Sequence, residues 1–249
     1  MKVCLISVEI FAWGKYGGFG RATRTIGSEL VKRGHQVSVV VPLRQDQKPV
    51  EMLDGMTVYG FPPLWPWASS RLFRQCDADV YHSCAPSFST HLAMRAMPDR
   101  AHIVTVRDPR DFSDWKMEFA LPSLNRLQVV HNFLYEHSWL VQRAVRRSNA
   151  VYAPAQYLIP KIQSLYHLAR APGFLPTPVT IPDQVRKAEQ PTVCYIARLD
   201  RRKRPTLFLD LARQFPGVTW LTSMMDQMLP SKRISMPFLI WVAWTCMDG

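Results

Sequence analysis

Apolar runs of strand length alternate along the chain with segments that have helical periodicity. The first run, VCLISVEI at residues 3–10, is rich in β-branched residues and largely apolar, as in a strand covered on both faces. Residues 21–33 then carry apolar side chains at helical spacing and are followed by Gly34, a residue favoured at the end of a helix. Residues 37–42 are again apolar, so this opening predicts a strand–helix–strand unit.

The alternation continues over the following hundred or so residues. Further strands are predicted at residues 56–61, 78–83, 102–108 and 149–155, and helices at residues 87–98 and 125–148. Repeated alternation of this kind is typical of a doubly wound parallel sheet. We therefore predict an α/β fold with a Rossmann-like N-terminal domain over residues 1–170.

A proline-rich segment, APGFLPTPVTIPD at residues 171–183, predicts an extended linker. Beyond it the pattern restarts, with a strand at 192–200, a helix at 206–215 and a strand at 217–222. The final residues, 223–249, lack regular alternation, and a doubly wound domain needs roughly 100 residues. We expect residues 184–222 to begin a second Rossmann-like domain, followed by an atypical tail, so that the C-terminal half is truncated.

The chain is strongly basic, with 31 Lys and Arg against 19 Asp and Glu and a net charge of +12. Such an excess favours an anionic partner, which could be a phosphorylated ligand, a nucleic acid or an acidic membrane surface. The 5 cysteines form no CxxC pair, which favours a reducing compartment. No apolar segment reaches the roughly 20 residues of a membrane span, and no signal peptide is evident. We expect a soluble cytoplasmic protein.

Glycines cluster between the first strand and the first helix, in the segment GKYGGFG at residues 14–20. Backbone N–H groups and the helix dipole make such a junction suited to anions. Gly17 and Gly18 would allow a phosphate or sugar to approach closely, and Arg21 adds a positive charge. The spacing matches neither the dinucleotide fingerprint nor a P-loop. A tight turn whose glycines adopt positive φ explains the loop equally well.

A second basic motif, YIARLDRRKRP, follows the predicted strand 192–200. Arg198 and Lys203 lie at its carboxyl end and just beyond, where open α/β sheets bind ligands. An arginine fork and a lysine point charge together suit a diphosphate. The charge run alone is more typical of a solvated loop or a nucleic-acid patch.

The segment GKYGGFGRATRTIGSELVKRGHQVSVVVP resembles the opening of group 1 (family 4) nucleotide-sugar glycosyltransferases, which have the GT-B fold. DVYHS, TVRDP, LPTPVTIP and IARLDRRKRPTLFLDLARQFPGVTWL resemble later family segments in the same order, roughly over residues 1–222. The resemblance implies two Rossmann-like domains and transfer of a sugar from a nucleoside-diphosphate sugar to an acceptor hydroxyl. It also implies no bound metal and no cofactor besides the nucleotide-sugar co-substrate, so that protein charges stabilise the leaving diphosphate.

The resemblance also assigns roles to single residues. Arg198 and Lys203 match the family's donor-diphosphate ligands, although Ala197 stands where glycine is usual. The family often has a histidine near the end of the strand that here reads TVRD, where this chain has Arg107 and Asp108. We expect Asp108 to act as a hydrogen-bonding or catalytic partner and Arg107 to contact the acceptor or a phosphate. An ordinary Asp-Pro turn is the equal alternative.

Other candidates are weaker. His82 stands at a predicted strand end and is a candidate acceptor contact. The histidines show no HExxH pair or tight cluster, so no metal site is predicted. The aromatic and basic segment 65–75 and the arginine-rich stretch 140–148 are more typical of a loop and a solvated helix face than of contact with an anionic membrane. Nucleic-acid binding is not expected, because neither an aromatic platform nor a reading helix accompanies the basic cluster.

One family feature is missing. A block of two glutamates separated by seven residues binds the donor in the family's C-terminal domain, and no glutamate follows Lys203 here. The chain is therefore expected to be a glycosyltransferase that is inactive if its donor domain is incomplete. The alternative is a non-catalytic fragment that binds a phosphorylated ligand or a partner chain.

Overall fold

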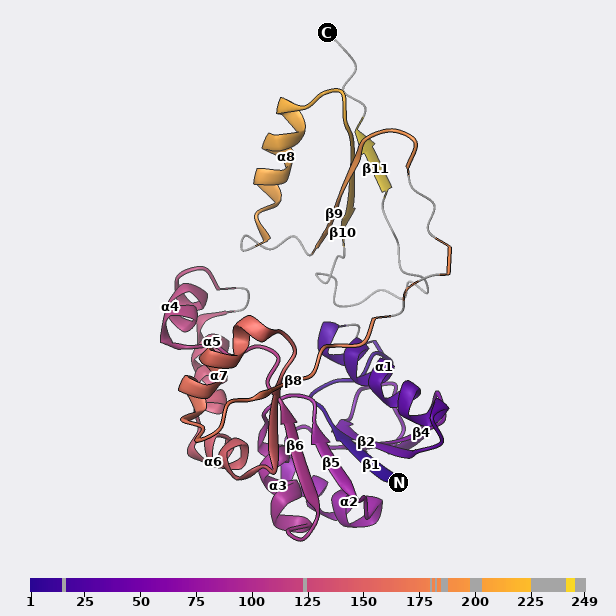
Figure 1. Cartoon of the computed structure of the whole chain (residues 1–249), viewed down its shortest axis with the longest axis vertical. Coiled ribbons are helices and arrows are strands. Elements are labelled where there is room, and N and C mark those ends of the chain that lie inside the picture. Colours follow the sequence, from indigo (N-terminus) through magenta and orange to yellow (C-terminus); the bar gives the residue numbers. More distant parts are fainter. Residues whose placement is uncertain are drawn as a thin grey trace. The chain divides into compact units, whose positions relative to one another are not determined.

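The computed structural model describes residues 1–14, 17–122, 125–179, 181, 183–184, 188–197, 203–224 and 241–244. The chain divides into two units (Figure 1). The first consists of Met1–Trp115 and Leu127–Thr180, and the second of Lys116–Arg126 and Ile181–Gly249.

The first unit is built on an eight-stranded sheet. Its strands are β1 (Lys2–Ile6), β2 (Gln36–Pro42), β3 (Val50–Leu53), β4 (Met56–Phe61), β5 (Val80–Ser83), β6 (Ala101–Thr105), β7 (Ala150–Ala153) and β8 (Gly173–Phe174). Their order is β3-β4-β2-β1-β5-β6-β7-β8. Every neighbouring pair is parallel except β3 and β4, which form an antiparallel hairpin at one edge. The predicted doubly wound sheet is confirmed.

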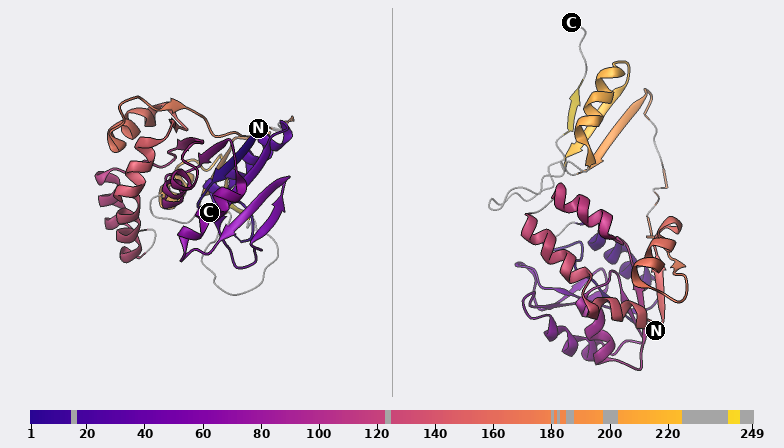
Figure 2. Two further views of the ribbon diagram at one scale, coloured as in Figure 1. Left: turned by 90° about the horizontal axis from the view of Figure 1, so that it is seen from below. Right: turned by 90° about the vertical axis from the view of Figure 1, so that its left-hand side faces the viewer.

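Helices cover both faces of this sheet, as the three views of Figures 1 and 2 show. The helices before residue 170 are α1 (Gly18–Lys32), α2 (Ser69–Cys76), α3 (Phe88–Ala96), α4 (Phe112–Ala120), α5 (Arg126–Glu136), α6 (Trp139–Arg147) and α7 (Ile159–Tyr166), with 3-10 turns η1 (Pro66–Ala68) and η2 (Gln156–Leu158). Of these, α4 crosses the boundary between the two units. Successive side chains of a strand point to opposite faces of the sheet, so neighbouring residues pack against different helices. Leu5 and Val39 pack under α1, whereas Ile6 and Val40 belong to the cluster that contains Phe73 of α2.

Several elements differ from the predicted ones. The first strand ends at Ile6, because the Ser7 hydroxyl donates to the Glu9 carbonyl at 2.8 Å and turns the chain. The strand predicted at 102–108 ends at Thr105. The helix predicted over 125–148 is two helices, α5 and α6, and the Ser138 hydroxyl caps the second by accepting from the Val141 N–H at 3.4 Å.

Two further elements were not predicted as such. The hairpin of β3 and β4 turns at Asp54 and Gly55, which both have positive φ. Helix α4 follows β6. The segment expected to be a linker also contributes β8, whose Gly173 pairs with Tyr152 of β7.

The second unit contains a strand–helix–strand motif. Strands β9 (Thr192–Ala197) and β10 (Thr219–Met224) are parallel and joined through α8 (Pro205–Gln214), and β11 (Trp241–Trp244) pairs antiparallel with β10. β11 lies in the tail that was expected to lack regular helix–strand alternation. The ring of Phe208 packs between Tyr195 and Trp220, with ring centroids 5.0 and 5.1 Å away. None of the helices in the described part of the chain is both long and apolar enough to span a bilayer.

Candidate functional site

The candidate site in the first unit lies at the carboxyl ends of β1, β5 and β6. From β1 the chain continues through α1 to β2 on one side, whereas β5 continues through α3 to β6 on the other. Ligands of open α/β sheets bind where the connections diverge in this way. Ser7 and Glu9 follow β1, Cys84 follows β5 and Arg107 follows β6.

The glycine loop brings α1 against the residues that follow β1. Gly17 is the N-cap residue of α1, with φ −80° and ψ 164°, so it does not need a left-handed conformation. The buried Glu9 carboxylate accepts a hydrogen bond from the Gly20 N–H at 2.9 Å. A Cβ on Gly17 would overlap this carboxylate. The absence of a side chain at Gly17 thus lets Glu9 reach the positive end of the helix.

The other predicted residues of the loop have different surroundings. Gly18 begins α1 in an exposed position, and a Cβ there would meet nothing within 4 Å. Arg21 is exposed, with its guanidinium 4.8 Å from the centre of the Phe11 ring. Glu9 was missed by the sequence analysis. The signal that could have found it is a carboxylate inside an otherwise apolar run.

His82 lies within β5 and is buried. Its Nε2 atom is 2.8 Å from the Thr105 hydroxyl of β6. Burial, and to a smaller extent the positive charge of Arg107, lowers the pKa of His82 to about 4. The imidazole is therefore neutral at neutral pH, so it can exchange hydrogen bonds without adding charge.

Arg107 is held by two hydrogen bonds from different parts of the sheet. Its Nε atom donates to the Cys84 carbonyl at 3.0 Å, and Nη1 donates to the Thr177 hydroxyl at 2.6 Å. Burial lowers the pKa of Arg107, but a guanidinium remains protonated at any physiological pH. The site thus combines a fixed cation with the neutral His82.

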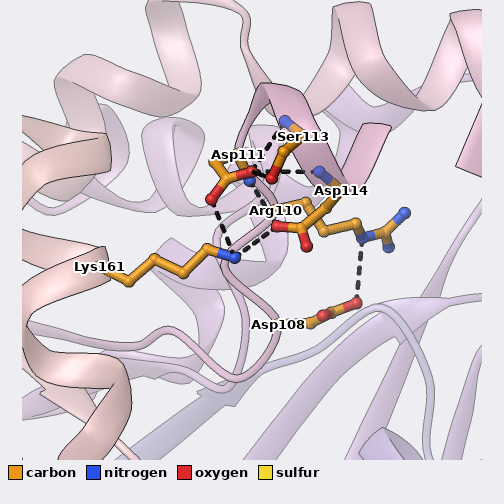
Figure 3. Close-up of polar contacts among 6 residues, drawn as sticks. All are labelled: Asp108, Arg110, Asp111, Ser113, Asp114 and Lys161. Carbon is orange, nitrogen blue, oxygen red and sulfur yellow. Dashed lines mark hydrogen bonds and ion pairs between the residues drawn. The ribbon is translucent and has the colours of Figure 1, made fainter. Parts of the chain in front are cut away.

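Asp108 belongs to a separate polar group (Figure 3). Its Oδ2 atom accepts from the Arg110 Nε at 3.0 Å, and the side chain of Asp108 is 54% exposed. Arg110 also pairs with Glu136 at 3.2 Å, and its guanidinium lies 4.5 Å from the centre of the Trp115 ring. Arg107 therefore lies near enough to His82 to lower its pKa, whereas Asp108 is bonded to Arg110 at the start of α4.

The neighbouring polar residues in Figure 3 form a capping box. The Asp111 carboxylate accepts from the Asp114 N–H at 3.1 Å, and the Asp114 carboxylate accepts from the Asp111 N–H at 2.9 Å. The Ser113 hydroxyl, the Asp114 N–H and Lys161 of α7 hold the pKa of Asp111 well below its usual range. Lys161 pairs with both aspartates, at 3.1 Å from Asp111. This cluster fixes α4 to α7.

The predicted donor-diphosphate residues belong to the second unit. Lys203 is exposed and stands between β9 and α8, and its carbonyl accepts from the Tyr195 hydroxyl at 3.0 Å. Arg198 lies outside the described residues. Within the described part of the chain, no group of three or more His, Cys, Asp or Glu side chains could hold a metal ion.

Several of the solved structures that the chain resembles are glycosyltransferases. An alpha-glucosyltransferase in complex with UDP and a 13-mer DNA containing an HMU base has a TM-score of 0.52 at 13% identity, covering 89% of this chain and 56% of that chain. An alpha-glucosyltransferase in complex with UDP and a 13-mer DNA containing a central A:G mismatch has a TM-score of 0.51 at 11% identity. The match covers 89% of this chain and 56% of that chain. Arabidopsis thaliana UGT89C1 complexed with UDP gives 0.46 at 13% identity, covering 89% and 65%. The predicted GT-B type fold is confirmed.

The chain thus spans little more than half the length of the glucosyltransferase that it matches. A comparison with curated protein sequences gave no significant match. The sequence profile of Glycosyltransferase Family 4, in contrast, matches residues 16–174, which is more than half of the 249 residues and includes Gly17, His82 and Arg107. The chain belongs to Glycosyltransferase Family 4.

Proposed function

We propose that the protein transfers a sugar from a nucleoside-diphosphate sugar to a hydroxyl group of an acceptor. The observation that carries this proposal is the fixed cation Arg107 beside the neutral, buried His82, at the carboxyl edge of a sheet in a chain of this family. Sugar transfer needs positive charge near a departing diphosphate and uncharged hydrogen-bonding groups near hydroxyls. Arg107 and His82 meet these two needs.

The roles of the remaining residues follow the chemistry of the reaction. Lys203 and Arg198 bind the donor diphosphate, because a diphosphate is best matched by point charges and guanidinium forks. The exposed first turn of α1, with Gly18 and Arg21, lines the path of the donor or acceptor. Asp108, which is half exposed, accepts a hydrogen bond from a sugar hydroxyl in exchange for its bond to Arg110. In this proposal, protein cations balance the diphosphate charge without a metal.

The first experiment is calorimetric titration of the whole chain with UDP, GDP and their sugar conjugates, with and without EDTA. UDP comes first because it is the nucleotide in the similar alpha-glucosyltransferase structure. We expect binding that EDTA does not change and that Lys203→Ala weakens roughly tenfold, the usual effect of one lost charge-assisted contact. Arg33→Ala, which removes an exposed charge at the far end of α1, is the matched control.

Transfer itself is measured as release of free UDP or GDP from the conjugate in the presence of candidate acceptors. Arg107→Ala should reduce this release more than it reduces nucleotide binding, because the charge on the diphosphate grows as the sugar leaves. A correctly folded chain that binds none of the nucleotides would overturn the proposal.

A further inference from the structure

A basic cavity lies in the first unit, against two neighbouring helices on one face of the sheet. It has a volume of about 590 Å³ and is bordered by α3 and α6, which lie side by side (Figure 1). Its ionisable lining consists of His91, Arg95, Arg100, His102, Arg143 and Arg147. None of the described residues that line it is acidic. The sequence predicts a solvated helix face for the arginines of α6, and Arg143 and Arg147 are indeed exposed where they border the cavity.

The arginines of this cavity are not equivalent. Arg100 donates to Asp77 at 2.6 Å and lies 3.9 Å from Asp79, so its charge is balanced. Within the described part of the chain, no carboxylate pairs with Arg95, Arg143 or Arg147. The cavity therefore carries a positive charge that the surrounding residues leave uncompensated.

These three arginines converge on one histidine. Burial lowers the pKa of His91, and the charges of Arg95, Arg143 and Arg147 lower it further. Arg143 and Arg147 are one helical turn apart on α6, and Arg95 faces them from α3. Like charges brought together in this way repel one another, and an anion bound between them would relieve the repulsion.

We propose that this cavity binds the phosphate group of a ligand between Arg95, Arg143 and Arg147. Each guanidinium presents several N–H donors in a fixed plane, which suits the oxygens of a phosphate. Trp139 supports Arg143, whose guanidinium lies 4.9 Å from the centre of the indole ring. The stacked ring orients the guanidinium without using any of its donors.

A second cavity indicates what the phosphate is attached to. It has a volume of about 390 Å³ and shares His91, Arg95 and Leu140 with the first, so the two are adjacent. Its other walls include the aromatic rings of Trp67 and Phe88. Ser70 and Arg74 also line it, so this cavity suits a group with an apolar part beside the phosphate. The phosphate then belongs either to a soluble compound with an apolar group or to a lipid headgroup.

This cavity is distinct from the candidate functional site. Arg100 and His102 stand at the beginning of β6, and Asn149 immediately precedes β7. The phosphate cavity thus reaches the amino ends of these parallel strands, whereas Arg107 follows the carboxyl end of β6. A ligand in the cavity leaves the proposed transfer site open.

The test compares the whole chain with the variant Arg143→Gln/Arg147→Gln in two assays. Calorimetry measures the affinity for two soluble ligands, inorganic phosphate and phenyl phosphate. Co-sedimentation with phosphatidylglycerol or phosphatidylcholine vesicles measures binding to lipid headgroups. We expect at least a roughly tenfold loss of affinity in the variant, in whichever assay the chain binds. Phenyl phosphate should bind more tightly than inorganic phosphate, because its ring occupies the second cavity.

Two controls separate this site from general charge and from the transfer site. Arg33→Gln/Lys48→Gln removes the same charge from exposed positions elsewhere and should change affinity less than twofold. Equal losses in the two double variants, or no binding by a folded chain in either assay, would overturn the proposal. UDP binding should be unchanged in Arg143→Gln/Arg147→Gln. The proposed phosphate cavity and the proposed transfer site are therefore tested independently of each other.

Discussion

The carboxylate of Glu9 accepts a hydrogen bond at 2.9 Å from the backbone N–H of Gly20, in the first turn of α1. The positive end of this helix therefore faces an anion supplied by the chain itself. A ligand phosphate that approached Gly17 would meet that carboxylate, which lies where a Gly17 Cβ would be. A phosphate at this loop would therefore depend on neighbouring cations, of which Arg21 and Arg107 are candidates, more than on the helix dipole.

Two glycines of the loop should differ sharply in their tolerance of a side chain. A Cβ on Gly20 would lie 2.8 Å from the Ile10 carbonyl carbon and 2.9 Å from the Phe11 nitrogen, and backbone atoms cannot move aside cheaply. Gly20→Ala should lower the free energy of unfolding by about 1–3 kcal/mol. Gly18→Ala, with open space around its Cβ, should be neutral or stabilising by up to about 1 kcal/mol. Urea denaturation of both variants checks this, and equal effects would contradict the packing argument.

Replacing Glu9 should test its role as an anchor of α1. Glu9→Ala leaves the Gly20 N–H without the carboxylate oxygen it donates to, and should lower the free energy of unfolding by about 1–3 kcal/mol. Glu9→Gln retains an oxygen acceptor in the same place and should lose less. Urea denaturation at neutral pH ranks the three proteins. If Gln were as destabilising as Ala, the negative charge and not the hydrogen bond would be the important property.

The sheet was predictable from the sequence because its signal is local. Buried residues such as Leu5 and Val39 sit in short apolar runs, and each run gives a strand whatever the rest of the chain does. The Asp54–Gly55 turn also carried a hairpin signal, but the half-exposed strand β3 has only 4 residues, too few for a clear pattern. Strand ends were less predictable, since Ser7 closes β1 through a hydrogen bond to a residue that reads as part of the same apolar run.

The candidate site was only partly predictable, because its contacts join distant positions. Arg107 was selected from the family resemblance at a strand end, but its partner Thr177 is 70 residues away in a segment predicted to be a linker. The neutral state of His82 depends on burial by other strands, which no local motif encodes. Glu9 meets Gly20 only after the intervening loop has folded.

The bond between Arg107 and Thr177 should stabilise the end of the sheet. Thr177→Val is nearly the same shape but removes the hydroxyl that accepts from Nη1 at 2.6 Å. Because the donor is charged and partly buried, we expect the free energy of unfolding to fall by about 1–3 kcal/mol. Thr177→Ser retains the hydroxyl and should lose less than half as much. Equal stability of Thr177→Val and the parent chain would show that water replaces the bond.

The low pKa of His82 makes a specific prediction about pH. The folded-state pKa is about 4, below the ordinary value of 6.5, so the unfolded chain binds more protons between these values. The His82 contribution to stability is therefore complete above pH 6.5 and is lost as the pH falls toward 4, by about 3 kcal/mol in all. In the variant His82→Gln, the glutamine side chain keeps a polar group beside Thr105 but has no titratable proton. Urea denaturation between pH 4 and 7 should give a shallower pH dependence for the variant. Other histidines, including His91 and His102, titrate in both proteins and cancel in the difference. Parallel curves would therefore mean that folding does not lower the pKa of His82.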